Sequence, residues 1–253
     1  AREGLPPATP PEIAAAKTAF GRLLSGRIVA VLLADEPFEG LHDSLAHVLR
    51  EDVPGGMQVV GEADAWHLIR AGSPAAQAIG GFALESHPEW GASLDTDAIV
   101  DLAFHEIRAI RSAASAIYVR VLSRFSPAYG NDSYPEMARL VRVLDSPWDD
   151  ARRFWFDMFR IMLPEQFTPA ILIAICDSPR EDTRALGREL VLINARPEDG
   201  LAYLTQLAEH PSADVQLFVT NYLHTYARDD ASRLAELAPY FTSVLSRVNT
   251  GRA

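Results

Sequence analysis

The fold of this chain is decided by a three-residue stretch that recurs in its second half as Asp145-Ser146-Pro147, Asp177-Ser178-Pro179 and Glu209-His210-Pro211. The copies stand at a constant offset of 32 residues, without gaps. The same offset is kept by the residues that follow, which are Asp150, Asp182 and Asp214 and then Arg152, Arg184 and Gln216. Proline fits the first turn of a helix but not its interior. Each stretch therefore predicts a tight turn at which one helix ends and another begins.

Apolar residues on both sides of the turn keep the same offset. Within each copy they fall at i, i+3 and i+4 before the turn and at i, i+3, i+7 and i+8 after it, which is the spacing of one buried helix face. Before the turn these positions hold Leu140, Leu172 and Leu204, then Val143, Ile175 and Leu207, then Leu144, Cys176 and Ala208. After the turn they hold Ala151, Thr183 and Val215, then Phe154, Leu186 and Phe218, then Met158, Leu190 and Tyr222, then Phe159, Val191 and Leu223. A pair of helices of about 30 residues cannot bury its own apolar face, so successive pairs must stack.

This pattern resembles HEAT repeats over residues 135–226. The resemblance rests on the Asp-Ser-Pro turns, the aspartate that follows each turn, and Arg152 and Arg184, while Gln216 departs from it. It implies an all-α fold, a right-handed α-solenoid of stacked antiparallel helix hairpins of the HEAT and armadillo superfamily. Such stacks usually hold peptides, helices or other domains against an extended curved surface.

The pattern continues less regularly upstream. Residues 65–86 and 97–125 predict two earlier helix pairs, in which Gln77 and Arg111 stand near the place of Arg152. We expect an insertion at residues 127–133, before the regular array.

The predicted division is an N-terminal helical segment, residues 1–62, followed by the repeat array, residues 63–253, with a C-terminal cap at 231–248. The N-terminal segment is poorly defined by its pattern. Residues 11–25 and 41–50 predict helices, whereas residues 27–34 fit either a helix or a short strand.

The composition is that of a globular protein with an acidic surface. The 253 residues carry a net charge of −11, and Lys17 is the only lysine. An acidic chain repels phosphate backbones unless its basic groups are gathered on one face, so nucleic acid is an unlikely partner. The bias toward arginine, alanine, leucine and aspartate is typical of a high-GC bacterial coding sequence.

Localisation is predicted from what the sequence lacks. No apolar stretch reaches the ~18 residues of a membrane span, and no signal-peptide pattern opens the chain. Cys176 is the single cysteine and lies in an apolar run, where a small buried side chain is expected. These features favour a cytoplasmic protein, and the Pro-rich opening fits a piece excised from a longer chain.

No catalytic, cofactor or metal motif stands out in the sequence. Phosphate-binding loops, the dinucleotide fingerprint and the paired-histidine zinc motif are all missing. The seven histidines are scattered singly. Acidic pairs such as Asp149-Asp150 lie at predicted helix starts, where carboxylates stabilise the helix. We therefore expect no catalytic residue, no cofactor and no metal.

One enzyme class remains an alternative because it shares the fold. HEAT-like DNA glycosylases remove alkylated bases on a basic, aromatic concave face with an essential aspartate. This chain has Trp148, Trp155 and Asp157 near several arginines. Against that class stand the negative net charge, the near absence of lysine and the acidic residues that surround Arg184 and Arg188.

The preferred interpretation is a non-catalytic protein-interaction or scaffolding module that binds another protein or a peptide. The candidate binding residues are Trp148, Arg152, Phe156, Arg184 and Arg188. Exposed aromatic residues near arginines are typical of binding hot spots. The repeat alignment assigns Phe154 to the core and leaves Phe156 exposed. A structural role competes for two of these residues, since Arg152 and Arg184 could instead bridge to Asp182 and Asp214 of the next repeat.

Overall fold

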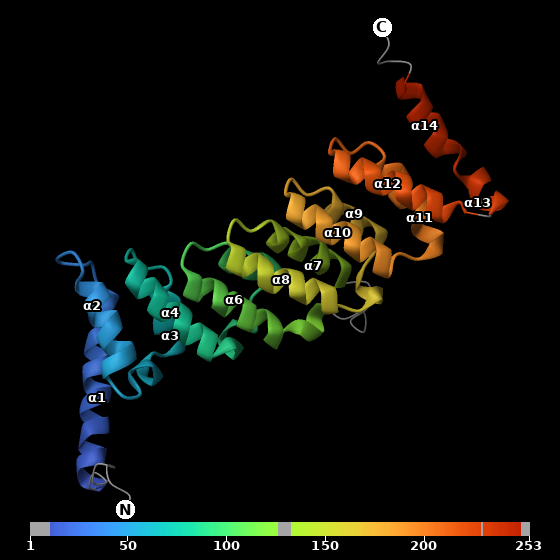
Figure 1. Ribbon diagram of the computed structural model, residues 1–253. Coiled ribbons are helices and arrows are strands. Elements are labelled where there is room, and N and C mark those ends of the chain that lie inside the picture. Colours follow the sequence, from blue (N-terminus) through green and yellow to red (C-terminus); the bar gives the residue numbers. More distant parts are fainter. Residues whose placement is uncertain (1–10, 126–132, 229, 249–253) are drawn as a thin grey trace, which may run out of the picture. The chain divides into compact units, whose positions relative to one another are not determined.

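The computed structural model describes residues 11–125, 133–228 and 230–248, and Figure 1 traces their course. Every regular element in these ranges is a helix or a helical turn, and no strand occurs within them. The all-α prediction is therefore confirmed. The Pro-rich opening, nearly all of the predicted insertion at 127–133 and the last five residues lie outside the described ranges.

The chain divides into two compact units, residues 1–121 and 122–253. The boundary expected at residue 62 from the repeat pattern falls inside the first unit. No helix of the described residues is long and apolar enough to cross a lipid bilayer.

The first unit consists of short helices joined by turns. Its α-helices are α1 (Pro11–Leu32), α2 (Leu41–His47), α3 (Glu62–Leu68), α4 (Pro74–Ser86), α5 (Thr96–Ala103) and α6 (Arg108–Arg120). One π-helical turn, η1 (Val48–Asp52), and two 3-10 turns, η2 (Gly56–Val59) and η3 (Pro88–Gly91), connect them.

Helix α1 settles the alternative left open for residues 27–34. It runs without interruption to Leu32, so the strand interpretation is wrong. Ile28, Val29 and Leu32 are all buried and share one helix face, because residues three or four apart lie on the same side. The hydrophobic run thus serves as the packing face of a helix.

Two adjacent glycines let α4 pack closely on both sides. A Cβ atom added to Gly80 would lie 2.8 Å from the carbonyl oxygen of Ala65 in α3. A Cβ atom added to Gly81 would lie 2.6 Å from the carbonyl carbon of Ala109 and 2.7 Å from the nitrogen of Ile110, both in α6. Helix α4 packs more extensively against α6 than against any other element. The core of the first unit is therefore centred on α4.

The second unit is a longer series of the same kind. Its α-helices are α7 (Ser133–Leu140), α8 (Asp149–Ile161), α9 (Pro169–Cys176), α10 (Glu181–Asn194), α11 (Gly200–Leu207), α12 (Ala213–Tyr226), α13 (Ala231–Glu236) and α14 (Ala238–Val248). Its 3-10 turns include η4 (Leu122–Phe125), η6 (Val141–Asp145), η7 (Pro164–Gln166) and η8 (Pro197–Asp199).

The regular spacing of the sequence reappears in the helix starts. Helices α8, α10 and α12 begin at Asp149, Glu181 and Ala213, which keep the 32-residue offset. Their ribbons follow one another from yellow to orange in Figure 1. Helix α9 packs against α10 and also contacts η6 and α11, so the first helices of successive pairs are in direct contact.

Most of the aligned apolar positions of the second unit are buried, whereas Met158, Ala208, Phe218, Tyr222 and Leu223 are only half-buried. Leu140, Leu172 and Leu204 are fully buried, and Cys176 is buried as expected, where desolvation raises the pKa of its thiol to about 12. Phe154, which the alignment assigned to the core, is only half-buried, whereas its neighbour Trp155 is completely buried.

Candidate functional site

A recurring contact holds each turn of the second unit. The side chain that follows the turn donates a hydrogen bond to the carbonyl oxygen six residues earlier. Arg152 donates to Ser146 at 2.7 Å, Arg184 to Ser178 at 3.1 Å and Gln216 to His210 at 3.0 Å. A glutamine thus makes the same contact as the two arginines, so the departure at Gln216 leaves the turn intact.

The first unit uses the same contact at two of its turns. Arg111 donates to the carbonyl oxygen of His105 at 2.9 Å, and Gln77 donates to that of Ala71 at 2.8 Å. The sequence placed both residues near the Arg152 position, and both make the same contact as Arg152. We call the contact, made at residues 77, 111, 152, 184 and 216, the turn clamp. It satisfies a carbonyl group that the ending helix leaves without an intrahelical donor.

The clamped residue also accepts a hydrogen bond through its own side chain. The backbone N–H two residues later donates to Ser146 Oγ at 3.4 Å, to Ser178 Oγ at 3.0 Å, to His210 Nδ1 at 3.1 Å and to His105 Nδ1 at 3.0 Å. Serine and histidine are therefore equivalent at this position, because each places an acceptor atom within reach of that amide.

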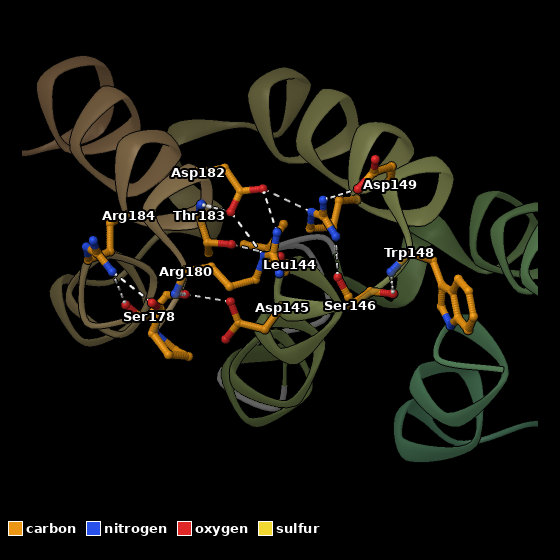
Figure 2. A network of polar contacts seen from close by, with 12 residues as sticks. Leu144, Asp145, Ser146, Trp148, Asp149, Ser178, Arg180, Asp182, Thr183 and Arg184 are labelled. Atoms are coloured by element: carbon orange, nitrogen blue, oxygen red, sulfur yellow. Dashed lines mark hydrogen bonds and ion pairs between the residues drawn. The ribbon is translucent and has the colours of Figure 1, made fainter. Parts of the chain in front are cut away.

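Two of the predicted binding arginines also bridge successive helix pairs. Arg152 Nε lies 3.0 Å from Asp182 Oδ2, and Arg184 Nε lies 3.3 Å from Asp214 Oδ2. Their side chains are only 11% and 12% exposed. The structural role that competed with partner binding is thus confirmed. Figure 2 shows Asp182 within the polar network and Arg184 directed to Ser178 of its own turn.

The remaining contacts of these arginines are also internal. Arg152 pairs with Asp149 at the start of its own helix, and Arg188 pairs with Asp214. Burial by itself would raise the pKa of Asp214, but hydrogen bonds from Arg188 and Arg184 outweigh it and lower that pKa. Asp182 has its pKa lowered in the same way, mainly by Arg180. Both carboxylates therefore stay ionised and serve as bridging anions.

A second series of bridges runs along the turns themselves. Ser178 Oγ donates to Asp145 Oδ1 at 2.5 Å, and His210 Nε2 lies 3.3 Å from Asp177 Oδ1. The two residues of each pair are 33 positions apart in the sequence. Each aspartate before a turn therefore contacts the turn of the next helix pair.

The aromatic candidates lie in different places. Trp148 is half-buried, and its ring points away from the polar network in Figure 2. Phe156 is half-buried on α8, where it lines a shallow depression of about 240 Å³ together with Asp149, Arg152, Arg153, Asp157, Arg160 and Asp182. The five candidates therefore do not form one cleft, although Arg152 and Phe156 share this depression.

Two lining residues escaped the sequence-based choice. Arg153 is exposed, and its side chain has no partner among the described residues. Arg160 bridges to Glu189 of α10 at 3.0 Å, and hydrogen bonding to Glu189 raises the pKa of this arginine. The spacing 153, 156, 157 and 160 is that of one helix face, which is the signal that could have identified them.

The charged side chains of this depression are mainly paired with one another. Asp149, Asp157 and Asp182 each lie next to an arginine. Hydrogen bonding and charge from Arg180 lower the pKa of Asp182 despite its burial. Among the residues that the structure describes, no three His, Cys, Asp or Glu side chains are grouped to hold a metal ion. The depression is instead a small charged surface with one aromatic side chain.

No protein-family model matches this chain, and neither the curated proteins nor the solved structures include a significant match.

Proposed function

We propose that this chain is a HEAT-like, right-handed α-solenoid and works as a non-catalytic protein-interaction module. The observation that carries the architecture is the turn clamp, which recurs with the same six-residue spacing at 77, 111, 152, 184 and 216. A contact repeated at every equivalent turn is what stacked copies of one unit require.

The proposed binding surface is the depression on α8 around Phe156 and Arg153, defined by its seven lining residues. Phe156 offers apolar area, and Arg153 offers a guanidinium group with no protein partner among the described residues. Aromatic residues and arginine are enriched in the energetic centres of protein interfaces. The fitting partner is a protein segment with an apolar side chain next to a carboxylate.

The internal contacts of the arginines support a protein partner over a nucleic acid. Arg152, Arg184 and Arg188 all face carboxylates of this chain. Binding of DNA depends chiefly on free lysines and arginines that neutralise phosphates. The DNA glycosylase alternative would need these ion pairs to open first.

The test is site-specific photo-crosslinking in the cells that make the protein. A photoreactive residue at Phe156 should crosslink to one protein, and the crosslink should disappear in the Arg153→Glu variant. The same photoreactive residue at Gln206, which is exposed on α11, serves as the matched control and should not give that product. The captured protein must then bind the purified chain, and fail to bind the Arg153→Glu variant, for the proposal to stand.

A parallel titration tests the alternative. The purified chain should not bind a fluorescent duplex that contains an abasic-site analogue, even at low salt. Binding that weakens steeply as salt is added, together with release of an alkylated base, would overturn the scaffold proposal in favour of the glycosylase.

A further inference from the structure

A cavity of about 410 Å³ lies in the first unit between the side chains of α3 and α5. Its volume is within the range of small-molecule sites, about 300–1,000 Å³. Its apolar lining includes Ile69 and Ile110, which are buried, and Trp66 and Leu102, which are half-buried. This cavity is unrelated to the depression on α8 and plays no part in the function proposed above.

The cavity lies beside the close packing of α4. Gly80 and Gly81 bring α4 against α3 and α6 at backbone contact. On the other side of these pairs, Trp66 of α3 and Ala98, Asp101 and Leu102 of α5 line the gap. Ala98, in the middle of the α5 face that lines the gap, is too small to fill it.

Three polar groups converge on this apolar cavity. Arg70, which follows α3, and Asp101 of α5 are exposed at its edge, and His105 lies half-buried beside them. Among the described residues, the guanidinium of Arg70, the carboxylate of Asp101 and Nε2 of His105 have no protein hydrogen-bond partner. Their positions therefore leave one cation, one anion and one ring nitrogen available to a ligand.

Two hydrogen bonds at this turn determine which ring nitrogen of His105 can donate to a ligand. Arg111 holds the carbonyl oxygen of His105, and the N–H of Ile107 donates to His105 Nδ1 at 3.0 Å. Since Nδ1 accepts, Nε2 must carry the ring proton and act as a donor. Burial, with the help of Arg111 and against the effect of Glu106, lowers the pKa of this histidine, so the neutral donor form prevails at neutral pH.

We propose that this cavity binds a large apolar α-amino acid in its zwitterionic form. The apolar side chain would enter between Trp66 and Leu102, the carboxylate would face Arg70 and His105 Nε2, and the ammonium group would face Asp101. Charge complementarity selects this ligand class. A simple carboxylic acid would meet Asp101 with like charge, and a simple amine would meet Arg70.

The experiment is calorimetric titration of the whole chain with L-phenylalanine and L-leucine. Each should bind, whereas 3-phenylpropionate and phenethylamine, which each lack one charge, should bind about tenfold more weakly. Ala98→Phe, which fills the cavity, should abolish binding.

Two exposed charges supply variants that keep the fold. Arg70→Gln should weaken phenylalanine about tenfold but strengthen phenethylamine, because it removes the charge that repels the amine. Asp101→Asn should likewise weaken phenylalanine about tenfold but strengthen 3-phenylpropionate. Glu62→Gln, on the exposed start of α3, is the matched control and should bind as the unchanged chain does.

Several outcomes would overturn the proposal. If neither phenylalanine nor leucine binds at ~10 mM, the proposed site does not exist. A ligand that binds more weakly than this gains no more than about 3 kcal/mol of binding free energy. Equal binding of N-acetyl-phenylalanine amide would mean that the cavity takes an apolar side chain of a protein segment and ignores the charges. Binding that survives in Ala98→Phe would place the ligand elsewhere. None of these results bears on the crosslinking at Phe156, so the two proposals fail separately.

Discussion

The two units join their successive helix pairs by different means. In the first unit, α4 and α6 meet at backbone distance through Gly81 and Ala109. In the second unit, α8 and α10 are joined by long side chains, with Arg152 reaching Asp182 and Arg160 reaching Glu189. The same turn clamp therefore supports both apolar close packing and polar bridging. The clamp orders each pair, and the residues on the second helix decide how far apart the pairs stand.

This difference has opposite consequences for the space between helices. Close contact of α4 and α6 goes with a cavity between α3 and α5, which Trp66 and Leu102 help to line. Polar bridging in the second unit instead goes with direct contact of the first helices, since α9 contacts α11. Four predictions can break or sharpen this contrast.

The largest effect is expected for Gly81→Val. A Cβ atom at this position would lie 2.6 Å from the backbone of Ala109, which cannot move without shifting α6. We expect a loss of about 3 kcal/mol in the free energy of unfolding, measured by chemical denaturation. Hydrogen exchange should show the loss within residues 62–121. Gly72→Ala is the control, because a Cβ atom there meets nothing within 4 Å, and a comparable loss in it would contradict close packing as the cause.

A smaller loss is expected for Arg152→Met. This change keeps the aliphatic bulk but removes the donor to Ser146 and the bridge to Asp182. We expect about 1–2 kcal/mol of destabilisation, because the Ser146 carbonyl loses its donor and Asp182 loses one of its two arginine partners. Arg153→Met, one residue along the same helix, removes a charge that has no partner among the described residues and should change stability by less than about 0.5 kcal/mol. Equal effects of the two variants would remove the distinction between bridging and free arginines.

Replacement of His42, a buried polar residue of the first unit, should increase stability, in contrast to the two losses above. His42 is only 2% exposed, and neither ring nitrogen has a hydrogen-bond partner among the described residues. His42→Leu removes the cost of burying these atoms and should raise the free energy of unfolding by about 1 kcal/mol. Thermal unfolding measures this change in stability. A lower midpoint in the variant would mean that the imidazole ring of His42 stabilises the fold.

The smallest effect is expected for the stability of the second unit at acidic pH. The pKa values of Asp182 and Asp214 are lowered in the folded chain, so their stabilising contribution is present above the ordinary carboxyl pKa of about 4 and is lost as the pH falls through the folded values. The second unit should therefore lose protection in hydrogen exchange below about pH 4. The double variant Asp182→Asn, Asp214→Asn should flatten this dependence. An unchanged profile would mean that other carboxylates control acid unfolding.

The turns were predictable because their signal is local. Proline, the preceding acid and the following aspartate fix the chain direction within about ten residues, and the helix starts at Asp149, Glu181 and Ala213 follow from them. The bridging role of Arg152 and Arg184 was also predictable, because the 32-residue offset pairs each of these arginines with the aspartate that follows the next turn.

The cavity and the depth of burial were not predictable in this way. An alignment of repeats assigned Phe154 to the core with Leu186, yet Trp155 is the residue that is fully buried. The Trp155 position corresponds to Gly187, where a Cβ atom would lie 2.7 Å from the nitrogen of Cys176. Side chains of such different size at one repeat position change the local spacing of helices. That spacing depends on contacts between distant segments, which no periodicity in the sequence records.

The turn clamp also bears on how the chain reaches its folded state. Each clamp joins residues six positions apart, and the bridges to the next pair join residues about one repeat apart, such as Arg184 and Asp214. Contacts of such short sequence separation demand little loss of chain entropy before they form. We expect folding to begin at one helix pair and to spread to its neighbours, so that the rate is set by local turns and hardly at all by the length of the chain.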